Sequence, residues 1–182
     1  RSIWCSRSAI PGENRFFYMV TCEDVHRWIE MPEAKVLPCH SSQLRLMKLH
    51  PSARHNIDVI PEYYDSIDTL GQNGFGWTVL GGGRFLVMFG ISMQWEGAAE
   101  AWLMVDHGGI GNHKIRLTKG ARNFFDNVGP AFGLRRCQIM VSVAHEEAVS
   151  WSRLLRFEHE ATLKQYGPDG ADHLVLARFY RD

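Results

Sequence analysis

The chain has 182 residues, 45% of them hydrophobic and 12% aromatic, and its 20 Lys and Arg balance its 20 Asp and Glu. A chain of this length can bury roughly two thirds of the surface that its unfolded state exposes, so we expect one domain over residues 1–182. The zero formal charge argues against broad binding of nucleic acid or anionic membranes, and the longest apolar run, residues 85–91, is far shorter than the ~20 residues of a membrane helix, so we expect a cytoplasmic protein.

The first part of the chain is predicted to be a strand followed by helices. Residues 16–20 favour a β-strand, and Thr21 with Asp24 three residues later is typical of a helix N-cap. Prolines interrupt the next stretch. There we expect two short helices, over residues 41–49 and 61–67.

Three β-favouring runs occupy the middle of the sequence, at residues 75–80, 84–94 and 99–106. Glycine-containing turns separate them, which is typical of hairpins. The sequence therefore predicts an antiparallel meander.

The remaining sequence alternates between helix and strand patterns. A glycine-rich loop at residues 107–113 comes first, and apolar residues then recur at helical spacing at Ala121, Phe124, Phe125 and Val128. After this helix we expect a strand over residues 137–143, a helix over residues 145–157 and a last strand over residues 173–180.

The cysteines and histidines lack the close pairing of a disulfide or zinc motif. The cysteines at 5, 22, 39 and 137 contain no C-x-x-C pair, and a chain of this size does not need disulfides. Cys39, His40, His50 and His55 come nearest to a metal cluster, but at wider spacings than zinc ligands usually have. We expect reduced thiols and no metal. For most of the tryptophans at 77, 95, 102 and 151, we expect core packing and not nucleobase stacking.

The order of these elements resembles the GNAT superfamily of acyl-CoA N-acyltransferases over nearly the whole chain, and the segment from His145 to Phe179 resembles it most. In texture, the sequence is most similar to small acyltransferase-like proteins encoded by tailed phages. The resemblance implies an α/β (α+β) fold with a mixed, mostly antiparallel sheet flanked by helices. It also implies that two central strands, residues 99–106 and 136–143, splay apart to admit the pantetheine arm of acetyl-CoA.

The glycine-rich loop resembles the turn that binds the coenzyme A pyrophosphate in this family. Free backbone amides and a helix dipole converge on the phosphates at such a turn. The family pattern is Arg or Gln, two residues, Gly, one residue, then Gly or Ala; read from Gly108, the sequence keeps Gly111 and has His113 last. An ordinary strand-to-helix turn would also explain these glycines. The resemblance places the cofactor at Val105, Gly108, Gly109, Ile110, Gly111, Asn112, His113, Lys114 and His145.

Direct acyl transfer requires a base for the amine and an acid for the departing thiolate. By resemblance, Glu100 and Glu96, at the start of the strand before the loop, are the candidate bases; solvated turn carboxylates are the alternative. The family's usual acid is a Tyr, and Ser152 stands at its position. Tyr166 is close enough in sequence to replace that Tyr, although packing would also explain it.

The sequence therefore predicts an N-acetyltransferase that moves an acetyl group from acetyl-CoA to an amine by direct transfer. The acceptor stays open among a protein lysine, a protein N-terminus, a small amine and aminoacyl-tRNA, because the fold does not decide among them. The departures from the family pattern favour an alternative, a non-catalytic GNAT-fold phage virion or host-interaction protein, located in the virion or the host cytoplasm. A nucleic-acid binder is a third reading, which a contiguous basic face would support.

Overall fold

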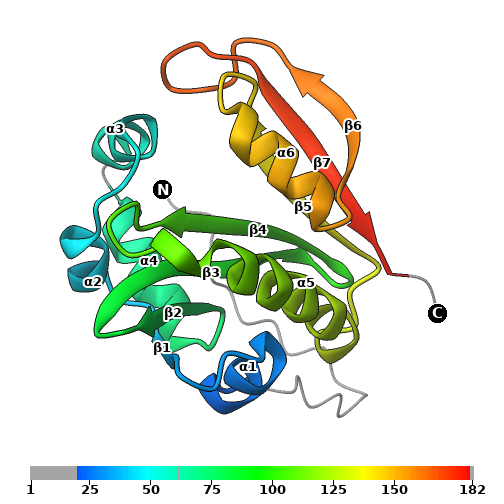
Figure 1. Ribbon diagram of the computed structural model, residues 1–182. Helices are drawn as coiled ribbons and strands as arrows, with labels where there is room; N and C mark the ends of the chain where they lie inside the picture. The colour runs from blue at the N-terminus through cyan, green and yellow to red at the C-terminus, as the bar shows by residue number, and fades with distance from the viewer. Residues whose placement is uncertain (1–19, 61, 181–182) are drawn as a thin grey trace.

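Seven β-strands form one sheet in the part of the chain that the computed structural model describes, residues 20–60 and 62–180 (Figure 1). Their order across the sheet is β1-β2-β3-β4-β5-β7-β6. Only β4 and β5 are parallel neighbours in this sheet, so the predicted mixed, mostly antiparallel architecture is confirmed. The strands are β1 (Lys35–Pro38), β2 (Gly76–Gly81), β3 (Arg84–Trp95), β4 (Ala98–Val105), β5 (Arg136–Ser142), β6 (Glu158–Leu163) and β7 (His173–Phe179).

Helices cover both faces of the sheet (Figure 1). The predicted N-cap is confirmed, because the Thr21 hydroxyl accepts a hydrogen bond from the Asp24 amide at 3.1 Å and the Asp24 carboxylate accepts one from the Thr21 amide at 3.1 Å. None of the described helices is long and apolar enough to cross a bilayer. The helices are α1 (Cys22–Ile29), α2 (Ser41–Leu46), α3 (Pro51–Val59), α4 (Tyr63–Gln72), α5 (Lys114–Ala131) and α6 (Glu146–Leu154), with a 3-10 turn η1 (Gly111–His113) before α5.

The structure contains elements that the sequence patterns did not predict. Strand β1 is four residues long and ends in a proline at the sheet edge, and β6 is exposed along almost its whole length. Neither strand has the alternation of apolar and polar residues that identifies a half-buried strand. Helix α3 was also missed, and it separates the two short helices that were expected. Apart from Val20, the strand predicted over residues 16–20 lies outside the described residues.

Two hydrophobic clusters hold the helices against the sheet. One joins α1 and α5 to the sheet and centres on Phe124, whose ring lies 4.9 Å from that of Phe89 and 5.7 Å from that of Trp77. The other lies under α2, α3 and α4 and includes Leu44 and Met88. The apolar stripe predicted for α5 is therefore confirmed as a core-facing surface.

The central strands β4 and β5 pair only at one end. Their register is Ala98 with Arg136, Ala99 with Cys137 and Glu100 with Gln138, and the pairing stops there. Beyond these residues β4 stays paired with β3, and β5 stays paired with β7. The two strands therefore diverge toward their C-terminal ends, which confirms the predicted splay (Figure 1).

Candidate functional site

A cavity of about 930 Å³ occupies the gap between β4 and β5. Consecutive residues of both strands line it, 101–105 on β4 and 139–142 on β5. Because successive side chains of a strand point to opposite faces of a sheet, the cavity reaches both faces. One side lies between α5 and α6, and the other is bordered by Ala53 of α3.

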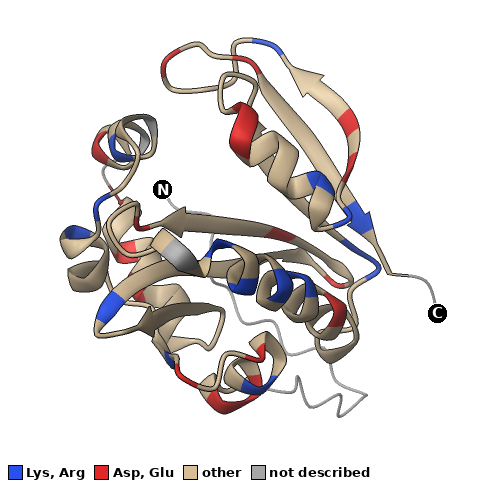
Figure 2. Cartoon of the chain, in the orientation of Figure 1, with Lys and Arg blue, Asp and Glu red and all other residues tan. Residues whose placement is uncertain are grey.

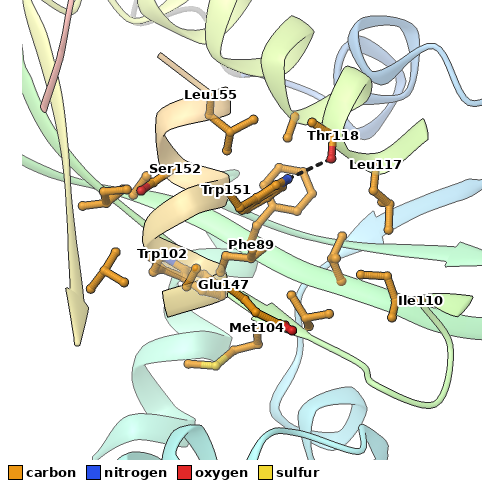
Figure 3. A pocket seen from close by; sticks show the side chains of 18 of the residues that line it. Phe89, Trp102, Met104, Ile110, Leu117, Thr118, Glu147, Trp151, Ser152 and Leu155 are labelled. Carbon is orange, nitrogen blue, oxygen red and sulfur yellow. Dashed lines mark hydrogen bonds between the residues drawn. The ribbon is translucent and has the colours of Figure 1, made fainter. Parts of the chain in front are cut away.

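The wall between α5 and α6 is largely apolar (Figure 3). Leu117 of α5, Leu155 after α6 and Phe89 of β3 contribute to it. Trp151 crosses from α6 to α5, where its indole N–H donates to the Thr118 hydroxyl at 2.9 Å. An extended, mostly apolar chain that also carries amide groups would suit such a wall, because the unpaired edges of β4 and β5 add backbone donors and acceptors to it.

The glycine loop after β4 is organised around the buried carboxylate of Asp106. One Asp106 oxygen, Oδ1, accepts hydrogen bonds from the amides of Gly108 at 2.6 Å and Gly109 at 2.8 Å, and the other, Oδ2, accepts one from the Lys48 amide at 3.1 Å. The Ile110 amide donates to the Asp106 carbonyl at 3.0 Å, and the His113 amide to the Ile110 carbonyl at 2.7 Å. Most of the amides proposed for a phosphate are thus used inside the loop. The Gly111 amide makes no hydrogen bond to a described residue.

The loop also fits the family pattern in a register that the sequence analysis missed. Read from Asp106, the pattern places Gly109 and Gly111 at both glycine positions, with Asp in place of Arg or Gln. The structure favours glycine at these two positions for different reasons. A Cβ at Gly109 would overlap the carbonyl oxygen of Phe85 on β3, whereas Gly111 has a φ of +24° and open space around it. Packing against β3 therefore requires glycine at 109.

We expect Gly109→Ala to lower the free energy of unfolding by about 3 kcal/mol, since the overlap is with backbone and no side-chain rotation relieves it. Gly111→Ala is the matched control. It meets no atom and should cost about 1 kcal/mol, because only its positive φ is strained. Urea unfolding of both variants measures the difference, and equal losses would contradict the contact with β3.

The three predicted catalytic side chains lie in different places, and none of them lines the cavity. Glu100 lies at the closed end of the gap, where its carboxylate accepts a hydrogen bond from the Gln138 side-chain amide at 3.3 Å. Glu96 lies in the exposed turn between β3 and β4. Tyr166 is 52% exposed and packs edge-on against His173, with ring centroids 5.5 Å apart. His173 itself lines the cavity.

Ser152, which stands where the family carries its acid, is buried, and its hydroxyl already makes a hydrogen bond within α6. Its Oγ donates to the Val149 carbonyl at 2.8 Å. The side chain reaches the cavity wall, but it offers no free proton in this arrangement (Figure 3).

The residues predicted to bind the cofactor divide into two groups. Five of them line the cavity: Val105, Ile110, Gly111, Lys114 and His145. Gly108, Gly109 and His113 belong to the loop but do not line the cavity. The side chain of Asn112 lies outside the described residues. The structure therefore brings together the end of β4, the start of α5 and the start of α6.

Three histidines, a group that the sequence analysis missed, meet at the open end of the gap. His145 stacks on His50 with ring centroids 5.1 Å apart, and His107 lies 5.8 Å from His50. Burial lowers the pKa of His145 below its usual value, and the neighbouring His50 lowers it further. The three lie far apart in the sequence, so no spacing signal could have found them.

The cysteines and tryptophans show where packing dominates. Burial raises the pKa of Cys39 and of Cys137 to about 12, so both thiols stay protonated. In the described part of the chain, no three His, Cys, Asp or Glu side chains are arranged to hold a metal ion. The tryptophans differ: Trp77 is buried, Trp95 is exposed, and Trp102 and Trp151 line the cavity.

Comparison with known proteins supports the fold. No protein-family model matches the chain. No curated protein sequence matches it either. Among solved structures, the chain is similar to a GNAT-family acetyltransferase from Bacillus anthracis, with a TM-score of 0.60 and 12% identity over 81% of this chain and 95% of that one.

Two ribosomal-protein acetyltransferases are similar to the same degree. RimL, the ribosomal L7/L12 α-N-protein acetyltransferase in complex with coenzyme A, has a TM-score of 0.60 and 15% identity over 81% of this chain and 94% of that one. The ribosomal-protein-S5-alanine acetyltransferase from Vibrio fischeri has a TM-score of 0.60 and 15% identity over 84% and 96%. At these identities the likeness shows the fold, which is that of GNAT acetyltransferases.

Proposed function

We propose that this protein is an acyl-CoA-dependent N-acetyltransferase that transfers an acetyl group from acetyl-CoA directly to an amine. The observation that carries the proposal is the cavity that passes through the sheet between β4 and β5. A thioester that enters the cavity from one face of the sheet and an amine that enters from the other face can meet inside it. Solved proteins of the same fold are acetyltransferases, and one of them is in complex with coenzyme A.

The residues of the gap fit the pantetheine arm better than they fit the phosphates. Apolar walls and the unpaired edges of β4 and β5 suit an arm made of methylenes and amides. At the phosphate end, the amides of Gly108 and Gly109 already donate hydrogen bonds to the Asp106 carboxylate. The phosphates would therefore be bound by the Gly111 amide and the Lys114 side chain at the start of α5, which both line the cavity.

Glu100 is the proposed base for the acceptor nitrogen as it attacks the thioester. It lies on β4 at the closed end of the gap, and Gln138 holds its carboxylate in place. A coenzyme A thiolate can depart without full protonation when rates are modest. The commitment of the Ser152 hydroxyl to Val149 is therefore compatible with slow transfer.

A non-catalytic GNAT-fold protein, such as a phage virion or host-interaction component, is the second candidate. It is favoured by the glycine-loop amides that already donate to Asp106. It is also favoured because the cavity lining does not include Glu100, Glu96 or Tyr166. Under this proposal the gap would be a structural remnant. The protein would act in the virion or the host cytoplasm, through a partner surface.

Isothermal titration with acetyl-CoA separates the two candidates. The enzyme requires binding at micromolar concentrations, together with release of free thiol when an amine is present. Absence of binding up to millimolar acetyl-CoA, by a folded protein, would leave the non-catalytic candidate.

A further inference from the structure

The three histidines at the open end of the gap come from three separate segments. His50 precedes α3, His107 follows β4 and His145 precedes α6. All three line both the cavity and an adjoining hollow of about 440 Å³. The fold therefore gathers three imidazoles, the histidine cluster, at the mouth of the proposed transfer site.

Two carboxylates border the hollow that the histidine cluster lines. Glu146 and Glu147, in the first turn of α6, line the same hollow, and Glu147 also lines the cavity. Figure 2 shows the acidic residues at the start of α6. The Asp106 carboxylate lies in the neighbouring loop and is satisfied by backbone amides. Other charged or titratable groups of the region are Lys48 before α3, Arg84 of β3, which donates to the Gly108 carbonyl at 3.4 Å, and three that line the cavity, Lys114, Asp169 and His173.

The histidine cluster also offers hydrogen-bond acceptors. The ring nitrogens of His107 and His145 make no hydrogen bond to another described residue. Burial lowers the pKa of His145, which favours the neutral form of this imidazole. A neutral imidazole has one nitrogen that accepts a hydrogen bond. Imidazole nitrogens beside the carboxylates of Glu146 and Glu147 suit a ligand that carries a positive charge and several N–H donors, which is a primary ammonium group.

Resting on the proposed function, we propose that the histidine cluster receives the amine acceptor. Its imidazole nitrogens accept hydrogen bonds from the primary ammonium group, and one of them takes the proton that the amine must lose before it enters the gap. Aliphatic ammonium groups have a pKa of about 10.4 in lysine, so the acceptor arrives protonated. Moving that charge between the apolar walls of the gap would be costly, whereas a neutral amine can pass.

Two protons leave the acceptor nitrogen during the reaction. The first moves to an imidazole of the histidine cluster, which returns it to solvent. The neutral amine then attacks the thioester carbonyl carbon, so that a C–N bond forms and the C–S bond breaks. The second proton passes from the nitrogen to Glu100, which returns it to solvent, and the thiolate takes up a proton from solvent after it has departed. The products are the amide, free coenzyme A thiol and one proton in solution.

Titration of histidine-labelled protein followed by NMR tests this assignment without requiring turnover. At pH 7, n-butylammonium should shift the Cε1–H resonances of His50, His107 and His145 with saturation, while exposed His159 on β6 stays unmoved. The matched probe is n-butyltrimethylammonium, which has the same charge but no N–H donor and should leave the resonances in place. Shifts by both probes alike, or by neither, would overturn the proposal. His→Gln variants assign the resonances.

A pH-resolved kinetic comparison gives a second readout. His145→Gln should raise KM for n-butylamine about tenfold at pH 7 with kcat within about twofold, and the difference should shrink near pH 10, where about a quarter of the amine is already neutral. His159→Gln is the control and should match the parent protein. A loss of kcat that is equal at both pH values would indicate a structural role only. Failure of acetyl-CoA to bind would remove the proposed function, whereas the NMR shifts decide this inference separately.

Discussion

Ala148→Trp should weaken the binding of acetyl-CoA at least about a hundredfold, which corresponds to about 2.7 kcal/mol. Ala148 lies on α6 and lines the gap between β4 and β5. An indole at this position would fill the space that the pantetheine arm requires. Because the new side chain enters an existing cavity and not the packed core, the fold should be retained. Isothermal titration measures the affinity, and circular dichroism verifies the fold.

Ser150→Trp is the matched control for this substitution. Ser150 lies on the same helix but is exposed and does not line the cavity. It should leave the affinity for acetyl-CoA within about twofold of the parent value, since surface substitutions usually have small effects. If Ala148→Trp binds acetyl-CoA as tightly as Ser150→Trp, the cofactor does not occupy the gap.

The sequence predicted those parts of the fold in which residue patterning is strong. The meander of β2, β3 and β4 has clear β-runs with glycine turns, and the α5 stripe around Phe124 has helical spacing, so both were found. Strands β1 and β6 were missed because their stability comes from pairing at the sheet edges and not from burial of an apolar face. Local patterning cannot reveal such pairing.

The candidate site was predictable only in part, because much of it depends on contacts between distant segments. The splay of β4 and β5 followed from the family resemblance and is present in the structure. Asp106 was overlooked because a strand-terminal aspartate carries no signal of which amides it will bind. The histidine cluster joins positions 50, 107 and 145, so it becomes visible only once α3, β4 and α6 are placed together.

Glu100→Gln should lower kcat about a hundredfold, which is the lower end of what a positioned general base contributes. The substitution keeps the size of the side chain and can retain the contact with Gln138, but it removes the carboxylate that we propose as the proton acceptor. Since Glu100 does not line the cavity, KM for acetyl-CoA should change by less than about twofold. Steady-state thiol release measures both constants.

Under the proposed function, the acetyl transfer by the parent protein should also show a pH profile that rises toward alkaline values, with no descending limb below about pH 9. The Ser152 hydroxyl already donates to the Val149 carbonyl, so it does not protonate the thiolate, and the proposed mechanism assigns no other acid to that step. Without such an acid, no group has to stay protonated for the thiolate to leave. Glu96→Gln and Tyr166→Phe are the comparison variants, since both side chains lie outside the cavity lining. If Tyr166→Phe alone removes activity while both glutamine variants retain it, the roles are wrongly assigned. Tyr166 would then protonate the thiolate from its position against His173. In that case the activity should fall again at the alkaline pH at which the Tyr166 hydroxyl loses its proton.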